Sequence, residues 1–204
     1  GGPSAAELFD QSMNYVGKAV DYHGHSDRGR DTDGADVLVI TNSADPTPIP
    51  NCQNGVVKSR LPAGTETCLR PLDWSMAVHI SCNNLGQGWC LVSTYNSGAA
   101  WPAYNNELLK VKLDGTQTIR LAHSRSSNAA YDAIPRAAIS PNGRYALFDS
   151  DMGGAVDVYL LTMPDDAPPD TTPPVITGVG VSGISSSTAT VAWTTNEPGD
   201  TQVN

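Results

Sequence analysis

Four side chains in this sequence are of the types that bind divalent metals: His25, His79, His123 and Asp27. His25 lies nine residues before Gly34 and His79 nine residues before Gly88, so the two imidazoles hold equivalent positions if the chain repeats. Three convergent imidazoles can hold a divalent metal, with Asp27 as a carboxylate ligand or as a group that orients one. The alternative is structural, with the same side chains forming hydrogen bonds between repeating units.

Glycine spacing predicts the repeat that would position these residues. Similar strand sequences follow Gly34 (ADVLVITNS), Gly88 (WCLVSTYNS) and Gly143 (RYALFDSDM), at intervals of 54 and 55 residues. Self-similarity at a fixed period indicates a repeat architecture. Each unit offers about four strands, and Asp114-Gly115 is a strong hairpin signal between two of them. The third unit carries Ile134, followed by Pro135 and Arg136, at the position where the first two units carry His.

Composition favours an all-β protein of many short strands. The 204 residues include 19 Gly and 15 Pro and few aromatic residues, a balance that suits strands and turns. Residues 5–15 are the one exception, predicted to form one or two helical turns. The net charge of −9 argues against nucleic acid or an anionic membrane as a partner, and no apolar run is long enough to span a bilayer.

The domain organisation follows from a change of composition near the C-terminus. Residues 1–163 carry the repeating strands, about three units. Residues 164–174, rich in Pro and Asp, predict an extended linker. Residues 175–204 begin a second domain with two alternating strands around a Ser-rich turn.

Several phrases resemble known families. ISPNGRYALFDSD and DVYLL resemble bacterial WD40-like β-propeller repeats of the TolB type, and GHSDRGRDTDGADVLV and NELLKVKLDGTQTIRLAHSRS resemble the propellers of oligogalacturonate lyases. The tail from residue 173 is similar to the first strands of fibronectin type III modules of the purple acid phosphatase kind. The expected fold is therefore all-β, with propeller blades followed by a partial immunoglobulin-like sandwich.

The lyase resemblance implies a manganese site in the propeller channel, where the first strands of neighbouring blades converge. His25, His79, His123 and Asp27 would be its ligands. The metal would acidify the α proton of a uronate, and Arg136 or Arg125 would bind the anionic sugar or remove the proton. The acidic run of Asp27, Asp31, Asp33 and Asp36 also suggests calcium, but it lacks the distal Glu of an EF-hand, and turn chemistry explains Asp33-Gly34 equally well.

Four cysteines and two aromatic residues complete the candidate set. Cys52 with Cys68 and Cys82 with Cys90 form two local pairs, predicted to be disulfides of an exported protein, with four buried thiols as the alternative. Trp101 and Tyr104, in a loop between strands, are candidates for an exposed platform that stacks on sugar rings.

The sequence is compatible with three functions. The first is an exported module, secreted or at the cell surface, that binds carbohydrate or protein. The second is a metal-dependent lyase of uronate oligomers. The third is a self-assembling protein completed by strand exchange, because a closed propeller needs at least about four blades and this sequence offers three. On the third hypothesis homo-assembly would use open strand edges; a fragment of a longer protein would also explain the blade count.

Overall fold

The computed structural model describes residues 5–42, 49–82, 88–96, 98, 101–164 and 175–196. The chain forms two compact units, Gly1–Asp165 and Asp166–Asn204, which are described separately. Of the predicted linker, all but Pro164 lies outside the described residues. Within the described ranges there is no α-helix, and the one helical element is a short 3₁₀ turn at Tyr131–Ala133.

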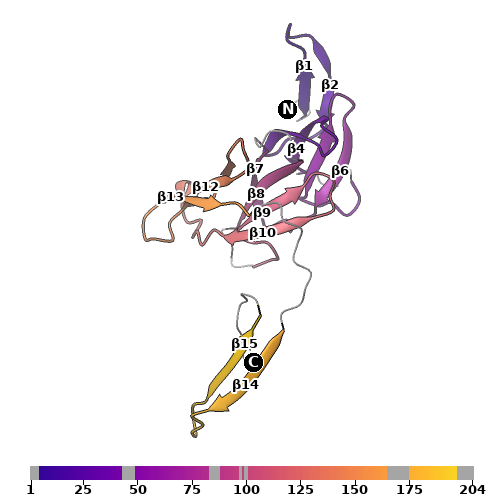
Figure 1. Cartoon of the computed structure of the whole chain (residues 1–204). Coiled ribbons are helices and arrows are strands. Elements are labelled where there is room, and N and C mark those ends of the chain that lie inside the picture. The colour runs from indigo at the N-terminus through magenta and orange to yellow at the C-terminus, as the bar shows by residue number, and fades with distance from the viewer. Residues whose placement is uncertain are drawn as a thin grey trace. The chain divides into compact units, whose positions relative to one another are not determined.

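Besides a two-stranded hairpin, the described part of the first unit forms three antiparallel sheets, which we call blades 1, 2 and 3 (Figure 1). Blade 1 has the strand order β3 (Ser26–Arg30), β4 (Asp36–Thr41), β5 (Val56–Arg60) and β6 (Thr65–Arg70). Blade 2 is formed by β7 (Ala77–Ser81), β8 (Trp89–Tyr95), β9 (Glu107–Lys112) and β10 (Thr118–His123). Blade 3 consists of β11 (Ala138–Ile139), β12 (Tyr145–Ser150) and β13 (Asp157–Thr162).

The three repeat glycines precede the second strand of each blade. Gly34, Gly88 and Gly143 have φ values of +84°, +67° and +71°. This left-handed region is accessible to Gly at little cost, which explains why Gly recurs at these turns. The repeat that the glycine spacing predicts is therefore confirmed.

Apolar cores lie between successive blades. Consecutive residues of β8 point to opposite sides, so that Val92 packs toward blade 1 and Leu91 toward blade 3. The core between blades 1 and 2 includes Val37, Val39, Val56, Val92, Leu109 and Val111. The core between blades 2 and 3 includes Leu91, Leu108, Ala146 and Phe148. Both faces of blade 2 are thus covered.

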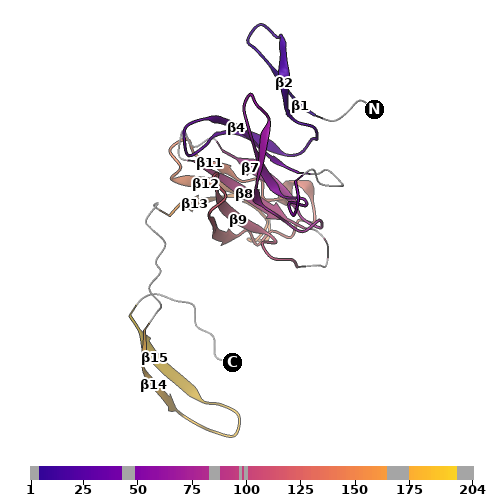
Figure 2. The ribbon, with the colours of Figure 1, turned by 90° about the vertical axis from the view of Figure 1, so that its right-hand side faces the viewer.

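A hairpin precedes blade 1, formed by β1 (Ala6–Phe9) and β2 (Tyr15–Val20), and it extends away from the blades (Figure 2). The end of β2 and the chain just after it cover the outer face of blade 1, where Val20 and Tyr22 pack with Ile40 and Val57. The Tyr22 hydroxyl donates to Glu66 at 2.7 Å.

The predicted helical turns at residues 5–15 are therefore wrong. Asp10 accepts hydrogen bonds from the backbone N–H groups of Ser12 and Asn14, both at 2.8 Å, which closes a turn. Aspartate favours such local turns over helix interiors, and strand pairing across the turn outweighs the helix propensity of Ala and Leu.

Both predicted cysteine pairs are disulfides. Cys52–Cys68 links the loop before β5 to β6, and Cys82–Cys90 links the end of β7 to β8. No free cysteine remains, so the alternative of buried thiols is wrong.

The described part of the second unit, residues 175–196, forms one hairpin of β14 (Ile176–Ser182) and β15 (Thr190–Thr195), with most side chains exposed. One hairpin does not define a fold, so the fibronectin-like assignment stays a prediction.

Candidate functional site

The structure brings together the two equivalent imidazoles. His25 precedes β3 of blade 1, His79 lies on β7 of blade 2, and their rings stack with centroids 4.2 Å apart and planes at 15°. Tyr95 of β8 stacks on His79, at 5.6 Å and 14°. The result is a row of three nearly parallel rings across the first two blades. His25 also lines a pocket of about 400 Å³ between the ends of these blades.

His25 forms a hydrogen bond from one blade to the next. Its Nδ1 is bonded to the carbonyl oxygen of Val78. Because a carbonyl only accepts, Nδ1 must carry the proton, and this nitrogen is not free to bind a metal. This contact matches the structural alternative for His25.

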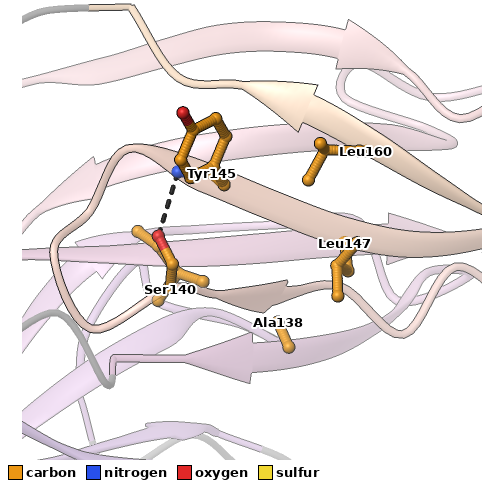
Figure 3. Close-up of a pocket in the computed structure, with 6 residues that line it drawn as sticks. Ala138, Ser140, Tyr145, Leu147 and Leu160 are labelled. Carbon is orange, nitrogen blue, oxygen red and sulfur yellow. Dashed lines mark hydrogen bonds between the residues drawn. The ribbon is translucent and has the colours of Figure 1, made fainter.

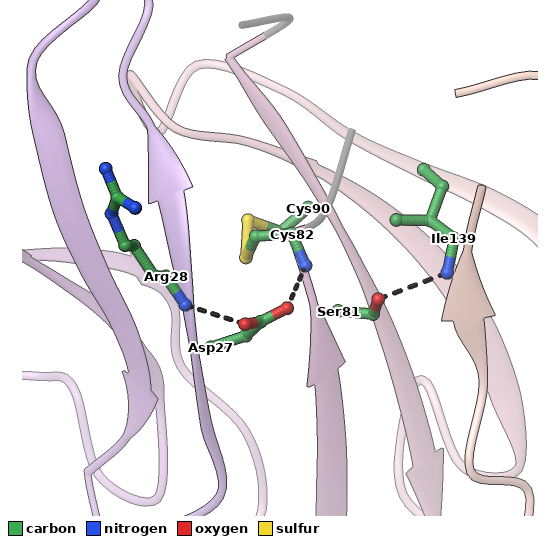
Figure 4. The surroundings of a disulfide bond; sticks show 6 residues. All are labelled: Asp27, Arg28, Ser81, Cys82, Cys90 and Ile139. Atoms are coloured by element: carbon green, nitrogen blue, oxygen red, sulfur yellow. Dashed lines mark hydrogen bonds between the residues drawn. A yellow bond between two sulfur atoms is a disulfide. The ribbon is translucent and has the colours of Figure 1, made fainter. Parts of the chain in front are cut away.

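Asp27 makes a second blade-to-blade bond. Its Oδ2 accepts the backbone N–H of Cys82 at 2.7 Å, and its Oδ1 accepts that of Arg28 at 2.8 Å (Figure 4). Ser81, which holds the corresponding place in blade 2, accepts the N–H of Ile139 in blade 3 at 3.1 Å. A short polar side chain on the first strand therefore ties each blade to its successor.

His79 is the most perturbed titratable group of the ring row. Its Nε2 is buried and has no hydrogen-bond partner. Burial, followed by the nearby positive charges of His25 and Arg136, lowers the pKa of His79 to about 4. The imidazole is therefore neutral near pH 7.

Arg136 lies near the row but is already paired. Its Nε and Nη2 bond to Asp149 at 3.2 and 3.0 Å, and its guanidinium lies over the ring of Tyr131, 4.9 Å from the centroid. The guanidinium contributes to the lowered pKa of His79. Binding of an anionic sugar by Arg136 would compete with the Asp149 carboxylate.

His123 lies elsewhere, on the outermost strand of blade 2. The strand order places β10 three strands from β7, a separation of roughly 14 Å at ordinary strand spacing. The described residues contain no group of three His, Cys, Asp or Glu side chains that could hold a metal. The predicted set of His25, His79, His123 and Asp27 thus does not fit a manganese ion.

The acidic run in blade 1 is taken up by ion pairs. Buried Asp31 bonds to Lys58 Nζ at 2.7 Å and to Arg60 at 3.2 Å. Asp33 pairs with Arg60 at 2.9 Å, and Asp36 pairs with Arg28 at 2.7 Å. These carboxylates stabilise the β3–β4 turn and its neighbours, so the calcium interpretation gains no support.

His123 instead forms an exposed aromatic pair with Trp101. Their rings stack at 5.4 Å with an angle of 9°, and Trp101 is 65% exposed. The backbone N–H of Arg125 donates to His123 Nδ1 at 3.0 Å, which fixes the imidazole and leaves Nε2 as its proton-bearing nitrogen. We call Trp101 and His123 the aromatic plate.

The loops behind the plate are tightly built. Asn106 accepts the N–H of Ser124 on its carbonyl at 2.7 Å and the amide of Asn128 on its side chain at 2.7 Å. Tyr104, Asn106, Arg125 and Asn128 all have positive φ, and for Tyr and Arg this conformation is strained. Such strain persists only where the surroundings impose it. This network was not predicted from the sequence, although the Asn-rich phrases AYNN and SSNAA could have indicated it.

Tyr104 is not part of the plate. Its ring is half-buried, packs against the core between blades 1 and 2, and lies between the guanidinium groups of Arg70 and Arg120, each 5.6 Å from the ring centroid. The predicted exposed platform therefore retains Trp101, gains His123 and loses Tyr104.

Comparison with known proteins supports the fold. No protein-family model matches the sequence, and no curated protein matches it at a significant level. TolB from Acinetobacter baumannii is 15% identical over 79% of this chain and 35% of its own, with a TM-score of 0.51. Oligogalacturonate lyase from Vibrio parahaemolyticus is 15% identical over 79% of this chain and 42% of its own, with a TM-score of 0.50.

The likeness at this identity concerns the fold alone. The described part of the chain is almost entirely β, and its three largest sheets are arranged as blades of a β-propeller. The chain spans less than half the length of either similar structure. No helix in the described part of the chain could cross a membrane. Two disulfides are consistent with an extracytoplasmic location.

Proposed function

We propose that this chain is an exported β-propeller module that binds carbohydrate through the aromatic plate. The observation that carries the proposal is the exposure of Trp101 while its ring is held parallel to that of His123. An immobilised, exposed aromatic face gives a sugar ring apolar contact at low entropic cost, and the His123 Nε2–H is available to donate to a hydroxyl. Export is inferred from the two disulfides.

A neutral polysaccharide is the expected ligand class. The net charge of −9 disfavours the approach of polyanions. The proposal includes no lyase chemistry, because Arg136 is engaged with Asp149 and His123 lies three strands away from His79.

The test is binding to a panel of soluble neutral and uronate-containing polysaccharides, measured by affinity electrophoresis and calorimetry. Trp101→Ala should weaken binding about tenfold or more, which corresponds to a loss of about 1.4 kcal/mol. Trp74→Ala is the matched control, because Trp74 is also exposed but lies before β7 and has no stacking partner among the described aromatic pairs. Equal binding by wild type and Trp101→Ala, or no binding to any polysaccharide, would contradict the proposal.

A further inference from the structure

The connection from β10 to β11, residues 124–137, carries a second exposed aromatic ring. Tyr131 begins the 3₁₀ turn Tyr131–Ala133 and is 72% exposed. The guanidinium of Arg136 lies over one face of its ring, 4.9 Å from the centroid, and is itself bonded to Asp149 at 3.0 Å. One face of the ring is therefore covered by a cation that an ion pair holds in place, and the opposite face is open to solvent.

Hydrogen bonds join this β10–β11 connection to the loop that carries Trp101. That loop begins at Asn96, and Asn106 is its last residue before β9. The side-chain amide of Asn128, in the connection, donates to the carbonyl oxygen of Asn96 at 3.1 Å and to the side chain of Asn106 at 2.7 Å. Because the connection also begins directly after His123, the aromatic plate and Tyr131 are carried by the same pair of bonded loops.

The length of the connection limits the distance between the two aromatic surfaces. Tyr131 follows His123 by eight residues, and a fully extended chain of that length spans at most about 29 Å. The hydroxyl of Ser126 donates to the carbonyl oxygen of Ala133, so the connection folds back on itself and spans less than that. A ligand of several linked sugars can contact both surfaces, whereas a single sugar can contact only one.

The charges on the connection favour an uncharged ligand. Two carboxylates, those of Asp132 and Asp151, lie on it or against it, and Asp151 accepts the backbone N–H of Ser127 at 2.8 Å. The two cations of the connection are Arg125 and Arg136, and the ion pair described above neutralises the second. Negative charge therefore outweighs positive charge here, which disfavours a polymer of uronates.

We propose that the open face of Tyr131 is a second stacking subsite, and that the ligand is an extended neutral oligosaccharide that contacts the aromatic plate and Tyr131 together. This inference rests on the carbohydrate-binding function proposed above and adds ligand length to what the site recognises. A ring that is already held in place gives a sugar apolar contact at low entropic cost. Once the plate holds one end of the ligand, contact with Tyr131 is intramolecular, which raises the affinity for any ligand long enough to reach it.

Calorimetry with size-fractionated fragments of each polysaccharide in the panel, from two to about ten sugars, tests the proposal. Wild-type affinity should rise at least tenfold once the fragments are long enough to reach both surfaces. Tyr131→Ala should weaken the binding of long fragments about fivefold or more and change that of the shortest fragments less than twofold. Tyr131→Phe keeps the ring and should retain the wild-type affinity, whereas Trp101→Ala should weaken the binding of short and long fragments alike.

Tyr145→Ala is the matched control. Tyr145 is also an exposed tyrosine, but it begins β12, about 14 Å along the strand from Asp149. Its ring lies beside Leu147 and Leu160 in an apolar pocket of about 260 Å³ on blade 3 (Figure 3). This variant should bind every fragment as tightly as wild type does, and circular dichroism checks that all variants are folded.

The outcomes separate the two proposals. If Trp101→Ala weakens binding but Tyr131→Ala binds long fragments as wild type does, or if affinity does not depend on length, the second subsite is overturned and the plate stands. A preference for uronate fragments would overturn the neutral ligand class. No effect of Trp101→Ala, or no binding to any polysaccharide, would overturn the proposed function and the second subsite with it.

Discussion

At the scale of single residues, His79 shows how burial converts an ionisable side chain into a structural one. Its pKa is about 4 in the folded chain, against an ordinary value of 6.5. The folded state therefore favours the neutral imidazole. The contribution of neutral His79 to the free energy of unfolding is complete above pH 6.5. It is lost as the pH falls from 6.5 toward 4.

The first prediction follows from this shift. Between pH 7 and pH 5 the wild type should lose about 1 kcal/mol of unfolding free energy through His79, a value that allows for screening by solvent at this half-buried site. His79→Phe keeps a ring between His25 and Tyr95 but cannot be protonated, so this part of the pH dependence should disappear. Urea unfolding at both pH values measures the difference, and identical pH dependence in the two proteins would refute the explanation.

At the scale of elements, the contacts between first strands hold the blades in order. Asp27→Ala removes the acceptor of the Cys82 N–H and should lower the unfolding free energy by about 1–2 kcal/mol. Asp27→Asn keeps an acceptor oxygen and should cost less. Asp36→Ala, which removes an exposed ion pair with Arg28, should change stability by about 0.5 kcal/mol or less. Chemical denaturation compares the three, and an equal cost for Asp27→Ala and Asp36→Ala would contradict the role of the blade-to-blade bond.

Sequence predicted the elements better than the site. Gly34, Gly88 and Gly143 indicate the blades, because a turn that needs positive φ strongly favours Gly and so can be recognised in the sequence. Local cysteine spacing likewise indicates both disulfides. The pairing of His123 with Trp101 has no such sequence signal, because it depends on how the loop that carries Trp101 folds against the end of β10. The hairpin at residues 6–20 was missed because its helix-favouring composition is outweighed by the turn at Asp10.

At the scale of the whole molecule, the two units differ in how much they bury. The blades share apolar cores, whereas the β14–β15 hairpin leaves Val179 and Val181 largely exposed and has only two strands. Two-stranded hairpins are at best marginally stable in water.

The resulting prediction concerns amide hydrogen exchange. Amides of β14 and β15 should exchange orders of magnitude faster than those of β8 and β9, whose side chains are buried on both faces. Exchange measured by mass spectrometry on peptides from each strand tests this. Protection of β14 equal to that of β8 would mean that the hairpin is covered by a partner.

The contact of Val20 and Tyr22 with the outer side of blade 1 bears on the order in which the blades can fold during synthesis. These two residues precede blade 1 in the sequence, so they leave the ribosome before the surface that they protect. Each later blade then emerges next to a face that is ready to receive it. Synthesis from the N-terminus can thus bury the apolar faces of blades 1 and 2 in turn, and among the three blades these contacts leave the outer face of blade 3 exposed.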